Sequence, residues 1–120
     1  MDDNTTIKEL KNIVKKFCEA RDWSQYHNPK DLAIGISTEA NELLEIFRFK
    51  SEDEINEILK NSNKRAKMEN EVADVLFFIL RFAQMNDIDL ETTLKRKVKI
   101  NKKKYPADLF KGSNKKYDEI

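Results

Sequence analysis

The sequence predicts an all-α fold, a bundle of the four-helix type, and three observations support this prediction. The 120 residues include only two glycines and two prolines, too few turn formers for a fold with many strands. Apolar residues recur at spacings of three and four over several long stretches, which is the period of an amphipathic helix. A chain of this length has room for one hydrophobic core. We therefore expect a single domain over residues 1–120.

The composition argues against an overall commitment to nucleic acid or to membranes. Lys and Arg number 23 against 22 for Asp and Glu, so the formal net charge is +1 and any strong field must be local. The one cysteine, Cys18, has no partner for an internal disulfide, and no apolar run approaches the roughly 18 residues of a membrane span. These features favour a cytoplasmic protein without a membrane partner.

The N-terminal part predicts a helix followed by an aromatic loop. Over residues 5–21 the apolar side chains form one stripe, and Cys18 falls on it, so we interpret Cys18 as a small buried hydrophobe rather than a nucleophile. Residues 22–29, DWSQYHNP, break this period with turn-forming residues. This short segment carries the only tryptophan and the only histidine of the chain.

The next two helices are predicted from their starts. A helix over residues 29–49 begins at Pro29, because proline is tolerated in a first turn. Ser51 and Glu54 match a capping box, which predicts a short helix that ends at about Lys60. We expect the polar residues 61–63 to connect this helix to the next one.

The last two helices differ in character. The helix expected over residues 64–86 has large apolar side chains around nearly its whole circumference, which is typical of a helix enclosed on all sides. A bundle of this size would not cover such a helix alone, so we predict a homo-oligomer. The final helix runs over residues 89–105 and stops before Pro106. Residues 107–120 show little periodicity and are expected to be extended or loosely docked.

Acidic residues stand where apolar residues are expected. On a helical wheel Glu39 falls inside the apolar arc of its helix, and Glu42 lies on the edge of that arc. Glu71 and Asp74 lie on the enclosed helix, where neither has an obvious solvent face. An ionised carboxylate buried alone is very unfavourable, so clusters of buried acids usually imply paired cations or a metal. Facing each other, these two i,i+3 pairs would make an all-oxygen cage.

The chemistry of this cage favours a hard divalent cation. Mg²⁺ and Mn²⁺ prefer carboxylate and water ligands, whereas zinc prefers His or Cys, and Cys18 and His27 stand alone in the sequence. Because protein-bound Mg²⁺ typically bridges to phosphates, we expect a phosphate-bearing substrate. The alternative for each pair taken singly is a solvated helix face with salt bridges, and Glu45 is equally consistent with plain surface.

The last predicted helix carries a second set of polar residues. Lys97, Asn101 and Tyr105 continue an apolar stripe, either to meet phosphate, sugar or base in the bundle or to snorkel at its rim. Residues 95–104 hold seven basic side chains, a run that is most often a solvated face. The alternative hypothesis is a non-enzymatic helical module that binds nucleic acid through this run. The near-zero net charge makes a nucleic-acid partner the less favoured interpretation.

Several motifs occur in a characteristic order. ExxE at residues 39–42 and ExxD at residues 71–74 are separated by 28 residues; RDW and an H-x-P turn precede them, and K-x-x-x-N-x-x-x-YP follows. In this order the motifs resemble those of the all-α nucleoside triphosphate pyrophosphohydrolases of the MazG-like class, and most of all its dCTP pyrophosphatases. The similarity runs from about Phe17 to the KKYDEI ending and so covers most of the chain.

The resemblance implies a four-helix MazG-like fold assembled as a homodimer or homotetramer. It implies an Mg²⁺-dependent hydrolase, with Mn²⁺ as a possible substitute, that cleanses nucleotide pools by cleaving dCTP or a related pyrimidine triphosphate to the monophosphate and pyrophosphate. The implied metal ligands, which are also catalytic, are Glu39, Glu42, Glu71 and Asp74. The implied phosphate and sugar contacts are Lys97, which also stabilises charge in catalysis, Asn101 and Tyr105. The implied lining of the nucleoside pocket is Trp23, His27, Phe49 and Phe78.

Two positions depart from the pattern of the family. Phe49 stands where the relatives carry Trp, and Phe78 stands where they carry Tyr, so a ring N–H and a hydroxyl are missing. Stacking on a base survives these changes because every base has a π-face, whereas discrimination by hydrogen bonds is weakened. We therefore expect the preferred base to be the property most open to change. The sequence also leaves open whether Glu42 or Glu45 accepts the proton of the attacking water.

Overall fold

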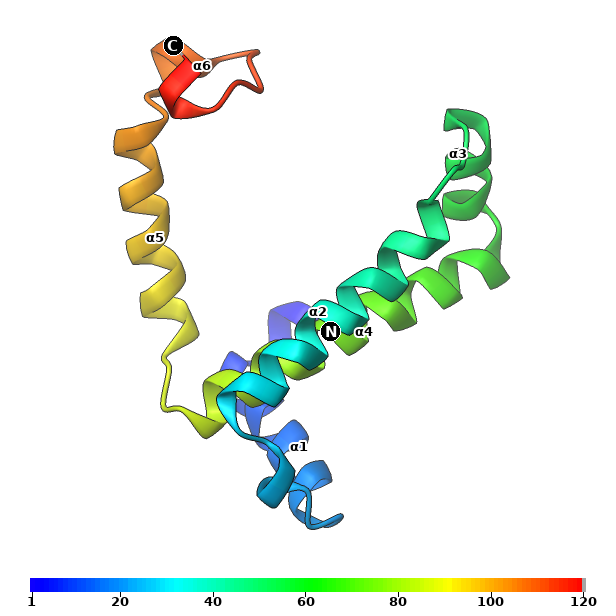
Figure 1. Cartoon of the computed structure of the whole chain (residues 1–120), viewed down its shortest axis with the longest axis vertical. Helices are drawn as coiled ribbons and strands as arrows, with labels where there is room; N and C mark the ends of the chain where they lie inside the picture. Colours follow the sequence, from blue (N-terminus) through cyan, green and yellow to red (C-terminus); the bar gives the residue numbers. More distant parts are fainter. Residues whose placement is uncertain (120) are drawn as a thin grey trace. The chain divides into compact units, whose positions relative to one another are not determined.

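The computed structural model describes residues 1–119 and is all-α, as predicted. Within these residues it has no strand, and its α-helices are α1 (Ile7–Glu19), α2 (Pro29–Phe47), α3 (Glu52–Lys60), α4 (Ser62–Met85), α5 (Leu90–Lys104) and α6 (Ala107–Phe110) (Figure 1). Short 3₁₀ helices occur at Asp2–Asn4, Ser24–Tyr26 and Tyr117–Glu119. The chain forms two compact units, Met1–Asp87 and a second that begins at Ile88, so a single domain over residues 1–120 stays a prediction.

Side-chain caps set the helix starts close to where the sequence predicts them. The side chains of Thr6, Asn28 and Asp89 each accept a hydrogen bond from the backbone N–H three residues later, at 3.1, 2.9 and 2.9 Å. Ser51 and Glu54 form the predicted capping box, with reciprocal hydrogen bonds of 3.2 and 3.1 Å. These caps satisfy backbone donors that have no partner inside the helix.

One prediction about a connecting segment is wrong. Residues 61–63 do not form a connector, because the Asn61 side chain caps α4 by accepting from the backbone N–H groups of Asn63 and Lys64, so the helix begins at Ser62. In the tail, which is expected to be extended or loosely docked, the short helix α6 forms directly after Pro106. In both places a local cap or turn decides the structure, which an apolar period does not report.

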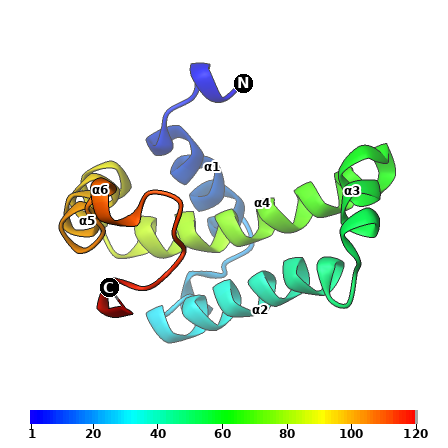
Figure 2. The same ribbon diagram turned by 90° about the horizontal axis from the view of Figure 1, so that it is seen from above.

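Helix α4 is the centre of the first unit. It packs against α1, α2 and α3, and the views of Figures 1 and 2 agree that α2 and α4 lie side by side and run in opposite directions. The residues of the small buried core come from all four helices: Val14, Cys18, Leu32, Ile58, Leu80 and Ala83. Cys18 is fully buried, which agrees with its interpretation as a small hydrophobe.

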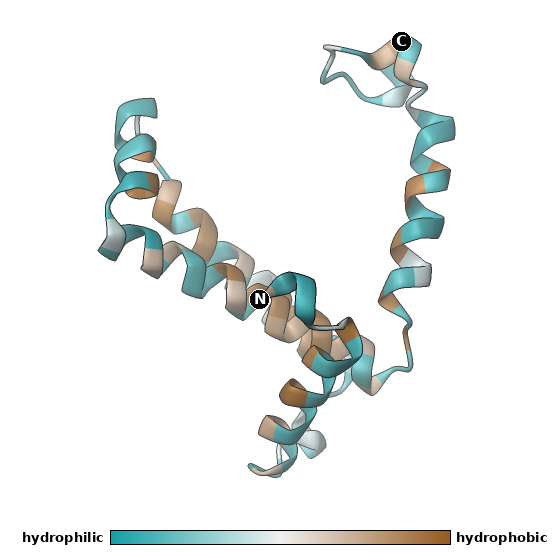
Figure 3. Ribbon diagram, turned by 180° about the vertical axis from the view of Figure 1, so that it is seen from behind, coloured by the Kyte–Doolittle hydropathy of each residue, from teal (hydrophilic) through white to brown (hydrophobic). Residues whose placement is uncertain are grey.

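A single chain does not enclose α4, as expected for a bundle of this size. Val72 is 48% exposed and Leu76 is 44% exposed, and with Ile79 they form an exposed apolar stripe at helical spacing. Hydrophobic residues are visible along α2 and α4 in Figure 3, whereas α5 is mostly hydrophilic. One chain therefore leaves part of the apolar surface of α4 exposed to solvent.

The second unit is held by aromatic contacts at its C-terminal end. The ring of Tyr105 meets the rings of Phe110 and Tyr117 edge to face, with centroids 4.9 and 6.0 Å away. These contacts are local in sequence, and α5 itself has no buried residue. Among the described residues, no helix is both long and apolar enough to cross a membrane.

The core position of Leu32 generates a stability prediction. Leu32 is 1% exposed, so Leu32→Ala is expected to lower the free energy of unfolding by about 2–5 kcal/mol through lost burial and a residual cavity. The exposed change Thr38→Ala on the same helix should alter it by no more than about 0.5 kcal/mol. Urea denaturation followed by circular dichroism measures both values, and equal effects would contradict the packing described for α2.

Candidate metal and nucleotide site

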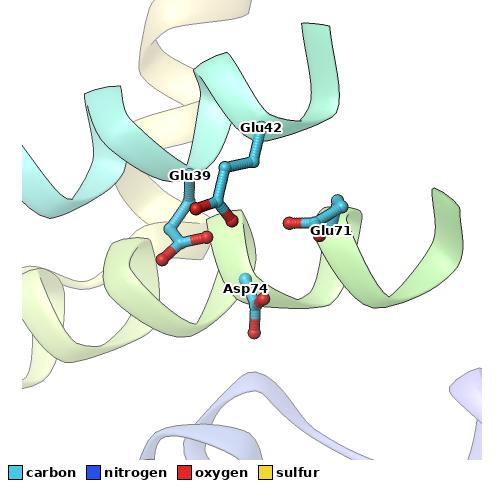
Figure 4. A group of neighbouring side chains, drawn as sticks. All are labelled: Glu39, Glu42, Glu71 and Asp74. Atoms are coloured by element: carbon cyan, nitrogen blue, oxygen red, sulfur yellow. The ribbon is translucent and has the colours of Figure 1, made fainter. Parts of the chain in front are cut away.

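The structure brings together the four carboxylates that the sequence selects. Glu39 and Glu42 lie one turn apart on α2, and Glu71 and Asp74 lie one turn apart on α4. Because the two helices lie side by side, one ligand oxygen from each residue falls within 4.8 Å of all the others. Figure 4 shows Glu39 and Glu42 reaching from α2 toward Glu71 and Asp74 on α4.

Burial divides the cluster into inner and outer members. Glu39 and Glu71 are half-buried, and the Oε2 atom of each is shielded from solvent without a hydrogen-bond partner. Glu42 and Asp74 are exposed, so the expectation that Asp74 lacks a solvent face is wrong for the single chain. A buried carboxylate oxygen without a partner is unfavourable, and a bound cation is one way to satisfy it.

The acidic residues perturb one another. Burial raises the pKa of Glu39 to about 7, with further contributions from hydrogen bonding with Glu42 and from repulsion by the neighbouring carboxylates. The pKa of Glu71 is also raised, first by burial and then by Glu42 and Asp74, while the ammonium of Lys67 acts in the opposite direction. Like charges this close cannot all remain ionised without a compensating cation.

The donor set fits a hard divalent cation. All four groups offer carboxylate oxygens, which suit Mg²⁺ or Mn²⁺, and neither Cys18 nor His27 belongs to the cluster. Two of the residues leave buried oxygens without partners, and the close spacing of the four groups lets one ion contact several of them. The site is thus chemically suited to hold a divalent metal ion.

An aromatic pocket adjoins this cluster. Its volume is about 440 Å³, and it is lined by Ile13, Val14, Phe17, Trp23, Asp74, Phe77 and Phe78. Trp23 and Phe78, two of the predicted nucleoside contacts, are therefore in one pocket. The ring of Phe17 lies edge-on to those of Trp23 and Phe77, each at 5.7 Å between centroids. Asp74 belongs both to the pocket wall and to the carboxylate cluster.

Gly35 on α2 makes room for the wall of this pocket. A Cβ atom at position 35 would lie 2.6 Å from two ring carbons of Phe78, closer than non-bonded carbons approach each other. Since a ring cannot bend away as a flexible chain can, any larger residue here would displace Phe78. A helix-interior glycine is unfavourable by itself, so its presence is explained by this close approach.

Two further predicted contacts do not line the pocket within one chain. His27 packs against Trp23, with 6.2 Å between ring centroids, but its Nδ1 atom is engaged by Arg81. Phe49 lies beyond the end of α2, is 90% exposed and has a positive φ of 61°. Gly35, against which Phe78 packs, is about 18 Å from Phe47 along the helix axis. A role for His27 and Phe49 in nucleotide binding stays a prediction.

The predicted contacts from the last helix belong to the second unit. Lys97 and Asn101 lie one turn apart on α5, and Tyr105 is its C-terminal cap residue. Lys97 is exposed and Asn101 is half-buried. Their contact with a phosphate or a sugar stays a prediction.

Some residues of the site were not selected from the sequence. Arg81, which is fully buried, is the one basic residue in the apolar run VADVLFFILRFA, and this isolated charge is the signal in the sequence that points to it. Gly35 was visible as a helix-interior glycine. No feature of the sequence distinguishes Lys67 from the many other lysines. Lys67 also lines a second cavity of about 520 Å³, together with Glu45, Ile46, Lys50, Asp53, Glu54, Glu57, Ile58 and Lys64.

Fold and site together define an all-α protein in which a carboxylate cluster suited to a divalent cation lies beside an aromatic pocket. A profile of the MazG-like family matches residues 34–120, which span parts of both compact units. The chain therefore belongs to the MazG-like family, as the resemblance of its motifs implied.

The chain is also similar to individual proteins. It is 31% identical over 115 residues to dCTP pyrophosphatase 1 of Homo sapiens, an alignment that covers 96% of this chain and 68% of that protein. The protein of the same name from Rattus norvegicus is 30% identical over the same coverage. The crystal structure of a pyrophosphatase from Archaeoglobus fulgidus matches with a TM-score of 0.75 at 41% identity, covering 82% of this chain and 91% of that chain.

The raised pKa of Glu39 predicts how metal-free stability depends on pH. Its pKa is about 7 in the folded chain against an ordinary value of 4.5, so between these values the folded state binds more protons than the unfolded state, and stability falls as pH rises. Glu39→Gln removes this contribution, and we expect it to raise the melting temperature at about pH 7.5 in EDTA but not at about pH 4.5.

The same measurement with metal supplies the control. Mn²⁺ or Mg²⁺ should raise the melting temperature of the wild-type chain at about pH 7.5 and that of Glu39→Gln much less. The matched variant Glu45→Gln, whose carboxylate pairs with Arg48 at 3.1 Å outside the cluster, should behave as wild type. If Glu39→Gln destabilised the metal-free chain at neutral pH, this would contradict the unfavourable burial and repulsion that we assign to the ionised carboxylate of Glu39.

Proposed function

We propose that this chain hydrolyses a nucleoside triphosphate, dCTP or a related pyrimidine nucleotide, to the monophosphate and pyrophosphate in the presence of Mg²⁺. One observation carries the proposal: the carboxylate cluster and the aromatic pocket adjoin each other and share Asp74. A metal site beside a base-sized aromatic pocket suits a ligand with a phosphate chain at one end and a ring at the other. The printed names of the relatives, dCTP pyrophosphatase and pyrophosphatase, support the same reaction.

The carboxylates have two proposed roles, metal binding and proton transfer. Glu39, Glu42, Glu71 and Asp74 would hold the metal. A bound divalent ion supplies charge neutralisation at the phosphates and lowers the pKa of a coordinated water. Of the two candidates for accepting the proton of the attacking water, Glu45 is paired with Arg48, whereas Glu42 lies in the cluster, so we assign this role to Glu42. Phosphoryl transfer needs no covalent nucleophile, which suits a site without Cys or His.

Helix α4 offers a track for the substrate. Phe78, Asp74, Glu71 and Lys67 follow one another at spacings of four, three and four residues, so they share one face of the helix. The first and last are about 16 Å apart along the axis. A base stacked at Phe78 would thus place its phosphates over the carboxylates, with the ammonium of Lys67 at the far end. Lys97 would add a further positive charge from α5.

We further propose that the active form is a homodimer or homotetramer. The stripe of Val72, Leu76 and Ile79 on α4 is apolar and exposed in one chain, which favours a second copy as its cover. A second copy would also give Phe49 a place at a nucleotide pocket that the same chain does not reach. The cytoplasm, where nucleotide pools are maintained, is the compartment we propose.

Glu71→Ala tests the reaction and the metal site together. We expect it to abolish turnover, because even residues that only support a metal ligand typically cost about 10- to 100-fold when changed. The matched variant is Glu69→Ala, an exposed glutamate of the same helix that lies 3.9 Å from Arg65 and should retain activity. Circular dichroism and gel filtration would check that both variants keep their fold and assembly.

Anion-exchange analysis of the products provides the readout. The wild-type chain should convert dCTP to the monophosphate and pyrophosphate only with Mg²⁺, and the ranking of other triphosphates shows how far Phe49 and Phe78 alter the preference. Full activity in Glu71→Ala would contradict the metal assignment. No turnover of any nucleotide by the wild-type chain would favour the alternative of a nucleic-acid-binding module.

Trp23→Ala tests the aromatic pocket separately. Loss of base stacking is expected to raise KM for dCTP by about tenfold while metal affinity stays unchanged. Tyr26→Ala serves as the control, since Tyr26 is an exposed aromatic residue of the same segment that does not line the pocket. Steady-state kinetics with dCTP and with inorganic tripolyphosphate gives the comparison. Equal activity of the wild-type chain on both compounds would show that no base is recognised there.

A further inference from the structure

We propose that Arg81 is a positioning residue for the nucleoside pocket: its guanidinium fixes the tautomer of His27 and holds the segment that carries Trp23 against α4. Neither the carboxylate cluster nor the pocket lining includes Arg81. The part of this proposal that concerns nucleotide affinity rests on the proposed function. The part that concerns His27 does not.

Arg81 is a buried cation with neutral partners. It is 0% exposed, and its three nitrogens donate one each to His27 Nδ1 at 3.0 Å, Gln84 Oε1 at 2.6 Å and Ser24 Oγ at 3.0 Å. Burying a charge is unfavourable even when its hydrogen bonds are made, and a leucine or methionine in its place on α4 would avoid that penalty. The retained charge and its directed donors therefore indicate a role beyond filling space.

Two of the three partners lie in one short segment. Ser24 and His27 are the first residue and the C-cap of the 3₁₀ helix between α1 and α2, and they are 57 and 54 residues from Arg81 in the sequence. Trp23 directly precedes this turn, and its backbone N–H donates to the carbonyl of Cys18 at 3.1 Å. Arg81 thus ties both ends of the turn to α4, one helical turn beyond Phe78.

The contact with Arg81 also determines the chemical state of His27. A guanidinium has donors only, so the Nδ1 atom of His27 must accept, and the ring hydrogen is on Nε2. If Nδ1 were protonated, its N–H would face the N–H of the positively charged Arg81, and neither group could accept a hydrogen bond from the other. The pKa of His27 is accordingly lowered, first by burial and then by Arg81. Arg81 of α4 is the charged group that acts on His27. The buried Cys18 of α1 interacts with Arg81 instead, and burial raises the pKa of its thiol.

A neutral ring with one fixed hydrogen has a use at a pocket for bases. His27 does not itself line the pocket in one chain but packs against Trp23, which does. Where His27 contacts the nucleotide as predicted, it would present Nε2–H as a donor and stay uncharged when the pH falls slightly below neutrality. A fixed donor can pair with an acceptor, such as a ring carbonyl, and rejects a donor in the same place. Arg81 would thus act on specificity through His27 and on stacking through Trp23.

The histidine can be observed directly. The chain has one histidine, so a long-range ¹H–¹⁵N spectrum of the protein, made without a histidine tag, contains the signals of His27 alone. We expect the Nε2–H pattern and a titration midpoint below the ordinary 6.5 in the wild-type chain. Arg81→Met should mix the tautomers and raise the midpoint. The matched control Arg65→Met, an exposed arginine of the same helix, should leave the spectrum unchanged.

Steady-state kinetics tests the effect on the substrate. Arg81→Met is expected to raise KM for dCTP by about tenfold, because stacking on Trp23 is misplaced, while kcat and Mn²⁺ affinity stay within about twofold. Ser24→Ala separates the two effects, since it loosens the turn but leaves the contact to His27, so KM should rise with the tautomer unchanged. If Arg81→Met fails to fold, Ser24→Ala still tests the effect on KM, an unchanged KM in it would overturn the role for Trp23, and the wild-type spectrum still tests the tautomer of His27.

The outcomes are distinguishable. An Nδ1–H tautomer in the wild-type chain, or an unaltered His27 spectrum in Arg81→Met, overturns the proposed role of Arg81. A fall in kcat with unchanged KM shows that Arg81 acts elsewhere than in base binding and likewise overturns it. Absence of turnover by the wild-type chain overturns the proposed function, and the histidine spectrum still decides whether Arg81 fixes His27.

Discussion

Repulsion among four carboxylates is the constraint around which the first unit is organised. Pairing α2 with α4 brings these groups within 4.8 Å of one another and buries two of their oxygens without partners. Such an arrangement opposes the packing of the two helices, because each ionised group disfavours ionisation of the others. Apolar contacts along the same helices, such as Phe78 against Gly35 and the burial of Leu32 and Leu80, offset this repulsion. Core packing thus holds α2 and α4 together against the repulsion of their carboxylates, and a bound cation would reduce this repulsion.

The sequence was most informative where structure depends on neighbours along the chain. Helix geometry is local, so the wheel correctly placed Glu39 and Glu71 toward the interior, and their i,i+3 partners followed at one turn. Caps are also local, and the box of Ser51 and Glu54 was found from spacing alone. To predict that α2 pairs with α4, one further assumption was needed: that the two unusual acidic pairs face each other and form one metal site.

Prediction failed where structure depends on distant residues or on more than one chain. The segment around Trp23 takes its shape from Arg81, more than fifty residues away, and no periodic pattern encodes such a contact. The solvent exposure of Asp74 follows from how many helices cover α4 in one chain, which the period of that helix does not state.

Asp74 stands on the boundary between the metal site and the aromatic pocket, and it cannot respond to one without affecting the other. A ligand that changes the position or charge of this one carboxylate changes the free energy of binding at both places, and thermodynamic linkage makes that effect equal in both directions. Under the proposed function, metal and base would therefore be mutual effectors at two adjacent sites. The order of binding would then not alter the final affinity, and a metal ion that favours the base would be favoured by the base to the same extent.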